Sequence, residues 1–262
     1  QLSELIKQQG YSVVISGTGA DEIFTGYYDH YLFWLYEMRL DSNFKQLIEE
    51  MKDGYGSYIN NPLLKDPIKI IDDPSFRGHL YQSSDVFKKI VRKKIERSFN
   101  EQSFCEDILR NRMLNELSEE VVPVILFSDD LNSMMYSIEN RSPFLDKNLV
   151  EFLFTIETKF LIKDGFQKYL LRNCSKNLLP KSILQSKKKI GFNASINSLM
   201  DLTKKKNIDW LLSDSDIFEI VRKDKMENIL KSDFSKNDYS KFLFAFISSK
   251  IFIDQQKKIQ NG

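Results

Sequence analysis

Residues 13–27 read VVISGTGADEIFTGY, and this stretch decides which fold the chain can adopt. It opens within a β-branched run, residues 11–16, which predicts a buried β-strand. The glycine turn Gly17-Thr18-Gly19 follows at once, and aromatic residues at helical spacing come after the turn. Before the strand, QLSELIKQQG predicts a short helix that ends at Gly10. Helix, strand, glycine turn and helix in this order are typical of an α/β sheet covered by helices.

The rest of the sequence is mainly helical in pattern. No second strand of comparable strength follows residue 16, so we expect a segment that is predominantly α-helical with little sheet. Prolines and paired Asn and Asp residues break regular structure across 54–77. Apolar residues at helical spacing predict helices over 85–104, 107–128, 149–155, 167–177 and 238–253. We expect a mobile loop at 203–216 and a disordered, lysine-rich tail at 254–262.

The composition is that of a globular protein without a strong field of either sign. The 262 residues are 42% hydrophobic, and 38 Lys and Arg oppose 37 Asp and Glu. This balance argues against a general nucleic-acid or anionic-membrane binder. The longest apolar stretch, 242–253, is interrupted by polar residues and is too short to span a bilayer. Cys105 and Cys174 have neither metal-ligand nor redox spacing, so a reducing, cytoplasmic setting fits best.

The turn at residues 16–22 is a candidate for chemistry. Its glycines let backbone N–H groups approach a phosphate, a helix N-terminus after it would favour an anion, and Asp21 could hold the accompanying Mg²⁺. The same residues also suit a tight turn in which Ser16 and Asp21 only cap a helix. Glycine spacing alone does not separate these two interpretations.

Four motifs occur in a fixed order along the chain. Residues 13–27 are similar to a strand and loop written SGEGADE-(L/V)-F-GGY, and SMMYSIENRSPFLD at 133–146 resembles S-M-A-x-x-x-E-x-R-x-P-F-L-D. GFQKYLLR at 165–172 matches G-x-x-K-x-x-L-R, and SKKKIGF at 186–192 looks like R-x-K-x-G-F. Together they make the chain resemble the glutamine-hydrolysing asparagine synthetase family, in the C-terminal part of its synthetase domain. The resemblance is clearest over residues 11–192, and we expect 1–262 to be one partial domain.

The resemblance implies an α/β parent fold, of the adenine nucleotide alpha hydrolase-like type with a pyrophosphatase-loop ATP-binding site. It also implies a two-step reaction with ATP and Mg²⁺ as cofactors. A carboxylate attacks the α-phosphorus of ATP and releases pyrophosphate, and a nitrogen nucleophile then displaces AMP from the acyl-adenylate. Aspartate and glutamine-derived ammonia are the default substrates. The resemblance is also compatible with a homodimer. Positioned cations and metal ions stabilise the negative charge that develops on pyrophosphate and on the tetrahedral intermediate of such a reaction.

The resemblance also assigns roles to five residues. Lys189 is the expected catalytic residue, because its ammonium suits stabilisation of pyrophosphate and of the collapsing intermediate. Asp21 would bind Mg²⁺ on the pyrophosphate. Ser16 and Gly17 would line the α-phosphate side, and Lys168 would help to bind the nucleotide.

Structural roles are expected for other conspicuous groups. Without the Gly191-Phe192 that follows, the lysines at 187–189 would be an ordinary solvated charge run, and the motif reverses that preference for Lys189 only. Glu139 and Arg141 are expected to form a structural ion pair near the site. His30 and His79 lack metal-ligand spacing, and the aromatic residues at 27–36 are more typical of core than of a base-stacking platform.

The match to the family has local departures. Thr18 stands where asparagine synthetases carry the glutamate of S-G-E-G, and a threonine cannot act as a base near neutral pH. Leu131 replaces the usual arginine after the matched aspartate, and Lys187-Lys188 replace the usual Arg-Pro. Thr18 therefore motivates a second enzyme reading with another acceptor, such as a sugar acid of a surface polysaccharide or a β-lactam-synthetase-like cyclisation.

A larger departure is that nothing in the sequence reads S-G-G-x-D-S, the pyrophosphate loop of the family. The N-terminal glutaminase is absent as well, and Gln1 is no initiator methionine, so we expect a piece of a longer parent. These 262 residues alone are then expected not to turn over ATP. From a different class, the chain could be a non-catalytic scaffold remnant that kept the fold after losing the nucleotide loop.

Overall fold

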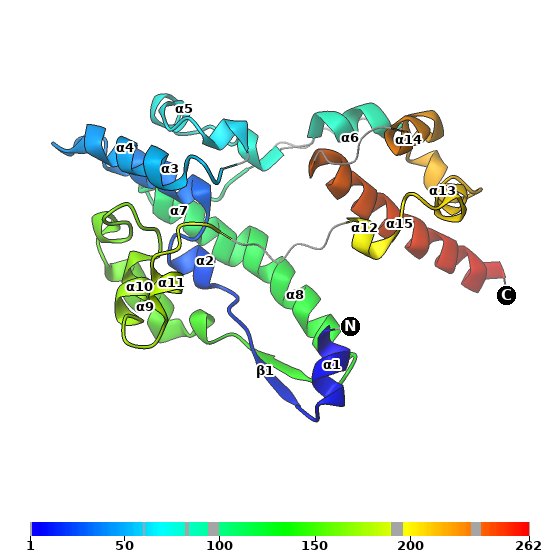
Figure 1. Cartoon of the computed structure of the whole chain (residues 1–262), viewed down its shortest axis with the longest axis horizontal. Coiled ribbons are helices and arrows are strands. Elements are labelled where there is room, and N and C mark those ends of the chain that lie inside the picture. Colours follow the sequence, from blue (N-terminus) through cyan, green and yellow to red (C-terminus); the bar gives the residue numbers. More distant parts are fainter. Residues whose placement is uncertain are drawn as a thin grey trace. The chain divides into compact units, whose positions relative to one another are not determined.

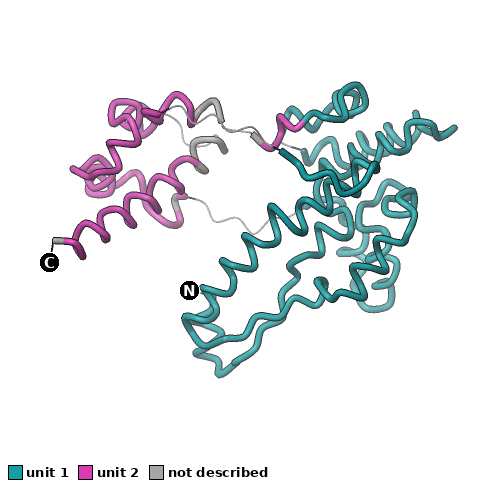
Figure 2. The backbone as a smooth tube through the Cα atoms, turned by 180° about the vertical axis from the view of Figure 1, so that it is seen from behind, with its two compact units in different colours: residues 1–76, 100–189 teal, residues 77–99, 190–262 magenta. Residues whose placement is uncertain are grey.

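The computed structural model describes residues 2–59, 61–81, 84–93, 100–189, 196–231 and 237–261, and this part of the chain is mostly helical (Figure 1). The chain divides into two compact units (Figure 2): residues 1–76 with 100–189 form unit 1, and 77–99 with 190–262 form unit 2. The expectation that residues 1–262 form one partial domain stays a prediction beside this division into compact units. Unit 2 joins two segments that are distant along the chain, so no linker in the sequence marks its boundary.

Unit 1 contains both strands and most of the helices. In chain order its elements are α1 Leu2–Gln8, β1 Val13–Ile15, α2 Ala20–Ile23, α3 Tyr28–Glu37, α4 Phe44–Tyr55, η1 Pro62–Leu64, α5 Ile68–Asp72, α7 Ile108–Asn115, the π-helical turn η3 Glu116–Glu120, α8 Val121–Met134, β2 Glu139–Arg141, η4 Pro143–Leu145, α9 Lys147–Thr155, η5 Thr158–Phe160, α10 Tyr169–Cys174 and α11 Lys181–Leu184. The expectation of a mainly helical segment with little sheet is confirmed.

The sheet of unit 1 consists of β1 and β2, which pair in parallel with Val14 opposite Asn140. The strand expected after the first helix is therefore present, but it is not buried. Val13 is 39% exposed and Ile15 is 74% exposed. Parallel strands are normally covered on both faces, and β1 lacks such a cover in the described residues.

The core of unit 1 is built around α3, which packs against α4, α5 and α7. The aromatic cluster predicted as core is largely that, since Tyr31, Phe33 and Trp34 are buried. Aromatic rings meet edge to face here, as Tyr31 does with Trp34 at 5.7 Å between ring centroids. The ring of Trp34 is also fixed by its indole N–H, which donates to the Thr158 carbonyl at 3.0 Å.

The turn after β1 differs from the long aromatic helix expected there. α2 ends at Ile23, and α3 begins only at Tyr28. Thr25 interrupts the helical path with a φ of 60°, a left-handed conformation that is strained for a β-branched residue. At the start of α2, Gly19 has a φ of 92°, and a Cβ there would lie 2.3 Å from Leu145 Cδ2. The turn therefore needs glycine at position 19 for both conformation and space.

Unit 2 is a separate helical cluster. Its elements are η2 Gly78–Tyr81, α6 Ser84–Ile90, α12 Ile196–Leu199, α13 Lys205–Leu211, η6 Asp216–Glu219, α14 Lys223–Leu230 and α15 Asn237–Asn261. Its core includes Ile90 of α6, Leu211 of α13, Met226 of α14 and Phe246 of α15. The segment at 203–216, expected as a mobile loop, instead contains α13, because buried Leu211 anchors it in this core.

The helix boundaries confirm some predictions and correct others. α7, η3 and α8 cover the helix expected at 107–128, and α9 matches 149–155. α10 is shorter than the expected 167–177. Of the helix expected at 85–104, α6 ends at Ile90, because the next residues bond across to residues 220–222, as Arg92 N does to the Ile220 carbonyl at 2.8 Å. Residues 94–99 of that range lie outside the described residues.

The lysine-rich end of the chain also departs from expectation. Residues 254–261 continue α15 where the sequence suggested disorder. Their polar side chains are used in contacts, since Asp254 pairs with the fully buried Lys250 at 3.1 Å and Lys257 pairs with Asp216 at 2.6 Å. The pair of Lys250 and Asp254 lies within α15, whereas the pair of Lys257 and Asp216 links this end of the helix to η6.

Candidate functional site

Asp21 lies at the centre of a small cluster of charged side chains in unit 1. It is the second residue of α2, directly after the turn that leaves β1. One carboxylate oxygen pairs with the ammonium of Lys168, and the other accepts from Lys189 Nζ at 2.8 Å. All three side chains are between a quarter and a third exposed. The fold thus brings together three residues predicted for the site, from positions up to 168 residues apart.

The two lysines outweigh burial in setting the charge of Asp21. Burial would raise the pKa of this carboxyl group, but the positive charges and hydrogen bonds of Lys168 and Lys189 together hold the pKa below its usual 3.8. Asp21 is therefore ionised at neutral pH. A carboxylate with two ammonium partners, open to solvent on one side, is suited to exchange those partners for a metal ion and phosphate oxygens.

The backbone holds Lys168 in an unusual conformation. Its φ is 55°, in the left-handed region, and it stands directly before α10. Its N–H donates to the hydroxyl of Thr25 at 3.3 Å, and Thr25 is itself left-handed and fully buried. Non-glycine residues in this region cost about 1–3 kcal/mol each and persist where surrounding structure enforces them. Two such residues in contact next to Asp21 mark a locally strained site.

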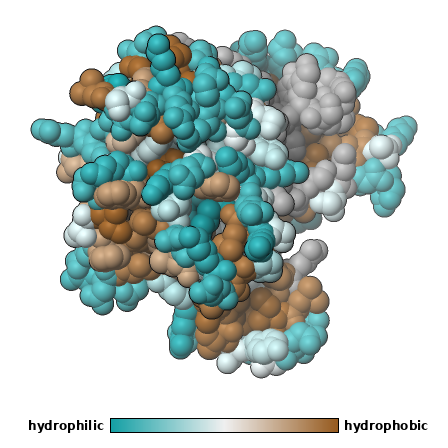
Figure 3. Space-filling view, turned by 60° about the vertical axis from the view of Figure 1, so that its left-hand side comes forward, coloured by the Kyte–Doolittle hydropathy of each residue, from teal (hydrophilic) through white to brown (hydrophobic). Residues whose placement is uncertain are grey.

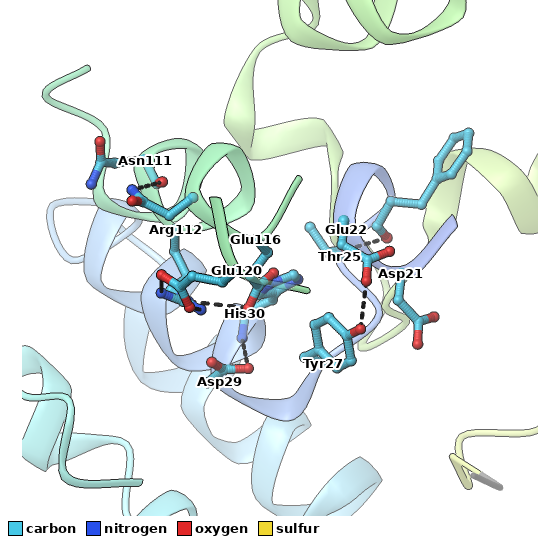
Figure 4. A network of polar contacts seen from close by, with 12 residues as sticks. Asp21, Glu22, Thr25, Tyr27, Asp29, His30, Asn111, Arg112, Glu116 and Glu120 are labelled. Carbon is cyan, nitrogen blue, oxygen red and sulfur yellow. Dashed lines mark hydrogen bonds and ion pairs between the residues drawn. The ribbon is translucent and has the colours of Figure 1, made fainter. Parts of the chain in front are cut away.

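Lys189 is held by two tyrosines of the segment that follows α2. Its ammonium lies 3.7 Å from the centre of the Tyr27 ring, a close cation–π contact. Its backbone N–H donates to the Tyr28 hydroxyl at 3.4 Å. The Tyr27 hydroxyl donates to Glu22 at 2.6 Å, so the ring itself is fixed (Figure 4). From the sequence, Tyr27 was predicted only as a core residue. Its contact with Lys189 could not be predicted, because the two residues are 162 positions apart in the chain.

Glu22 does not belong to the charged cluster. Figure 4 shows the neighbouring carboxylates diverging, with Glu22 turned toward Tyr27 and Asp21 turned away from it. Glu22 is buried, and burial together with Glu22 raises the pKa of the Tyr27 hydroxyl far above its usual value. Tyr27 therefore stays neutral and acts as a support. Asp21 is the carboxylate of α2 that remains accessible to a ligand.

Ser16 and Gly17 lie at the beginning of the same turn. The Ser16 hydroxyl is 2.9 Å from that of Ser142 and donates to the Thr18 hydroxyl at 3.1 Å. A Cβ added to Gly17 would meet nothing within 4 Å, so open space borders this backbone. Thr18 places a neutral hydroxyl at the position where a carboxylate was expected from the resemblance. The hydroxyls in this turn can donate to an anion but cannot serve as a base.

The predicted run of solvated lysines is only partly solvated. Lys188 is exposed, while Lys187 is half-buried, with its ammonium 4.6 Å from the centre of the Phe166 ring. Lys187 also fills the space beside two glycines, since its Nζ lies 2.8 Å from where a Gly54 Cβ would stand and 3.0 Å from that of Gly165. Gly191 and Phe192, which gave Lys189 its motif, lie outside the described residues.

A second polar network, to the left of Glu22 and Asp21 in Figure 4, is structural. His30 Nε2 and Glu116 Oε2 are 2.6 Å apart, both buried, and Arg112 bonds Glu116, Glu101 and Glu120. Asp29, His30 and Glu116 lie close enough to suggest metal ligands. The short His30–Glu116 contact leaves no room for an ion between those two atoms, and the other oxygen of Glu116 already accepts from the Arg112 guanidinium at 3.1 Å. The packing role expected for His30 fits this arrangement.

The expected structural roles of the 139–146 segment also have counterparts in the structure. Glu139 and Arg141 form an exposed ion pair at 2.9 Å on β2. Asp146 caps α9, accepting from the backbone N–H groups of Asn148 and Leu149 at 3.0 and 3.1 Å. Cys105 and Cys174 are free and exposed. Among the described residues, no helix is both long and apolar enough to cross a membrane.

Comparison with known proteins identifies the family of this chain. The model of the family described as asparagine synthase matches residues 1–252, so the chain belongs to the asparagine synthase family. It is 23% identical over 258 residues to asparagine synthetase [glutamine-hydrolyzing] 1 of Bacillus subtilis (strain 168), covering 89% of this chain and 39% of that protein. It is 26% identical over 186 residues to asparagine synthetase [glutamine-hydrolyzing] 3 of the same organism, covering 69% and 26%. No solved structure matches the chain.

The chain spans less than two fifths of the length of either curated relative.

Proposed function

We propose that this chain supplies the lysine and aspartate side of the nucleotide site in an ATP-dependent, amide-forming ligase. The observation that carries the proposal is the Asp21 carboxylate bridged by Lys168 and Lys189 at the turn after β1. The two lysines bring two positive charges to one carboxylate, so an anionic ligand can be bound without further cations from this chain. Pyrophosphate, released when ATP adenylates a carboxylate, is such an anion.

In the proposed first step, an oxygen of the substrate carboxylate bonds to the α-phosphorus of ATP as the bond from that phosphorus to the bridging oxygen breaks. Negative charge then gathers on pyrophosphate. The Lys189 ammonium, which is held by its contact with the Tyr27 ring, would stabilise the pyrophosphate as a point charge. Lys168 would bind the same anion from its fixed backbone position. Ser16 and the open backbone at Gly17 would line the α-phosphate side.

Mg²⁺ fits the donor set at Asp21. A single accessible carboxylate combined with substrate phosphate oxygens is a common way for proteins to hold this ion. When bound, Mg²⁺ would neutralise charge on the leaving pyrophosphate. Asp21 would then release at least one of its lysine partners to the phosphates, which its position between them allows.

In the proposed second step, a nitrogen nucleophile attacks the acyl carbon, and the bond to AMP breaks as the intermediate collapses. The default reaction converts aspartate to asparagine with ammonia from glutamine, which places the parent in asparagine biosynthesis. Thr18 supports an alternative acceptor, a surface-polysaccharide sugar acid or a β-lactam-synthetase-like cyclisation, because its neutral hydroxyl bonds Ser16 and offers no base for the incoming nitrogen. A panel of carboxylates with ATP separates these options.

The exposed strand supports a larger parent domain. Among the described residues β1 is uncovered, and α8, which contacts β2, exposes Val124, Phe127 and Leu131 to solvent. Apolar residues are visible at the surface among polar ones in Figure 3. We propose that a pyrophosphate-loop segment and a glutaminase, absent from this sequence, complete the parent, and that its setting is the cytoplasm. A scaffold that has lost catalysis would expose the same surface.

Substitution of Lys189 tests the proposal in the full-length parent. Lys189→Ala should lower the rate of ATP-dependent pyrophosphate release by about 10²–10³-fold, because one positioned charge donor to the developing anion is lost. Lys188→Ala is the matched control and should stay near wild type, since Lys188 is exposed and lies outside the Asp21 cluster. The measurement is a coupled pyrophosphate assay with saturating ATP and Mg²⁺.

Near-normal activity of Lys189→Ala would contradict the assignment of Lys189. No pyrophosphate release from the wild-type parent with any carboxylate of the panel would favour the scaffold instead. The 262-residue chain assayed by itself should release none.

A further inference from the structure

Arg172 makes an unusual set of bonds on α10. Within the described part of the chain, its guanidinium donates to backbone carbonyls: Nε to Gln167 at 2.8 Å, Nη1 to Ile183 at 3.2 Å and Leu184 at 2.7 Å, and Nη2 to Ser186 at 2.9 Å. The side chain is half-buried and lies over the Phe166 ring, 5.4 Å from its centre. No carboxylate of the described residues pairs with this guanidinium. Its work is to tie segments of backbone together.

The carbonyls bound by Arg172 belong to two different segments. Gln167 directly precedes Lys168, and Ser186 stands three residues before Lys189. Both lysines pair with Asp21. One guanidinium therefore joins the two stretches of chain that carry the cations of the candidate site.

The segment before Lys189 has few other regular constraints. α11 ends at Leu184, and residues 186–189 have no helix or strand to hold them. Arg172 holds this stretch at one end, and Lys187 holds its middle by packing over Phe166 beside Gly54 and Gly165. A stretch without regular structure that is held by side chains in this way depends on each of them.

We propose that Arg172 is a positioning residue: it sets the place of the Lys189 ammonium, and with it the spacing of the two cations on Asp21. This deepens the proposed function and rests on it for its chemical meaning. Arginine is needed because its planar fork reaches several carbonyls at once from fixed angles. Lysine at the same position would keep the charge but not the fork.

The direct test needs no ATP. The full 262-residue chain and its variants are trace-acetylated with acetic anhydride at pH 8, and the labelled fraction of each lysine is read by mass spectrometry. In Arg172→Met, labelling of Lys189 should rise about threefold relative to Lys188, because loss of an ion pair of partly exposed groups frees the amine by about that factor. Asp21→Asn supplies the reference for a freed Lys189, and Arg172→Lys should fall between wild type and Arg172→Met.

Lys176→Met is the matched control, since it removes another basic side chain just beyond α10 that takes no part in these carbonyl bonds. It should leave Lys189 labelling unchanged. If Arg172→Met raised labelling of every lysine together, the chain would have unfolded, and Arg172→Lys decides by the ratio of Lys189 to Lys188. An unchanged ratio in a folded Arg172 variant would overturn the proposal.

The same variants in the full-length parent separate this inference from the proposed function. Pyrophosphate release should fall in Arg172→Met with the larger change in kcat, since ATP can still bind while Lys189 is misplaced. If wild-type parent released no pyrophosphate but Lys189 labelling still rose in Arg172→Met, the proposed function would fail and the positioning role would stand. If activity were present but Arg172→Met left both kcat and Lys189 labelling unchanged, the positioning role would fail alone.

Discussion

At the scale of single residues, the sequence allowed candidate site residues to be predicted where they lie within motifs. It did not predict residues whose contacts join segments that are distant along the chain. Asp21, Lys168 and Lys189 each stood in a quoted motif, and the structure brings them into one cluster. Tyr27 was assigned to the core, although its ring supports Lys189. Arg172 was identified only as part of the G-x-x-K-x-x-L-R motif. Its hydrogen bonds to carbonyls of another segment could not be predicted, because they produce no periodic pattern in the sequence.

Gly19 provides a residue-scale test of the turn. Gly19→Ala should destabilise the folded chain by about 1–3 kcal/mol, because alanine is strained at a φ of 92° and its Cβ would press on Leu145. Gly17→Ala is the matched control, since its Cβ would meet open space, and its effect should stay within about 0.5 kcal/mol. Urea unfolding at pH 7 measures both, and equal losses in the two variants would contradict the described turn.

At the scale of elements, apolar periodicity predicted where helices exist better than where they end. α7 and α9 follow the expected ranges because capping residues define their starts; Asp107 accepts from Arg110 N at 2.8 Å before α7. α6 stops early because residues 91–92 find partners near Val221, a contact 130 residues away. The prediction that β1 is buried was also wrong. A run of β-branched residues indicates a strand, but it does not show whether other elements cover that strand.

The ion pairs of α15 give an element-scale prediction. Asp254→Asn should lower the midpoint of urea unfolding of unit 2 several times more than Lys257→Met does. Asp254 is the carboxylate partner of Lys250, whose ammonium is fully buried, whereas Lys257 and Asp216 form a surface pair. Tryptophan fluorescence can follow the transition, because Trp210 lies in this unit. Equal effects of both variants would mean that Lys250 finds other compensation.

The His30–Glu116 pair links α3 to η3 and predicts a pH dependence. Burial would lower the pKa of His30, but the adjacent Glu116 carboxylate outweighs it and holds the pKa above 6.5. Stabilisation by protonated His30 is therefore fully present below pH 6.5 and is lost as pH rises through the folded pKa. The stability advantage of wild type over His30→Asn should shrink between pH 6 and pH 9 in urea titrations.

Glu116→Gln serves as the control for this pair. It removes the carboxylate charge that raises the pKa of His30, so the pH dependence of the advantage should disappear with it. An advantage of wild type that grows toward pH 9 would show that buried His30 is stabilising in its neutral form.

At the scale of the whole molecule, the chain is two compact units. Their existence could not be predicted from composition, because the chain enters unit 2 at residue 77, leaves it, and re-enters after residue 189 without a marked linker. Family membership could be predicted, since the ordered motifs lie almost wholly in unit 1, and the family match spans residues 1–252. The candidate site likewise lies in unit 1, where long-range pairing of Asp21 with both lysines assembles it.

The discontinuous course of unit 2 governs the order in which the chain can fold during synthesis. Residues 77–99 leave the ribosome 90 residues before the rest of their unit begins at residue 190. Unit 1, by contrast, has all its residues once Lys189 has emerged. The apolar residues of α6, Ile90 among them, therefore lack their unit 2 partners until the second segment has been synthesised, and in that interval they are available for non-native contacts.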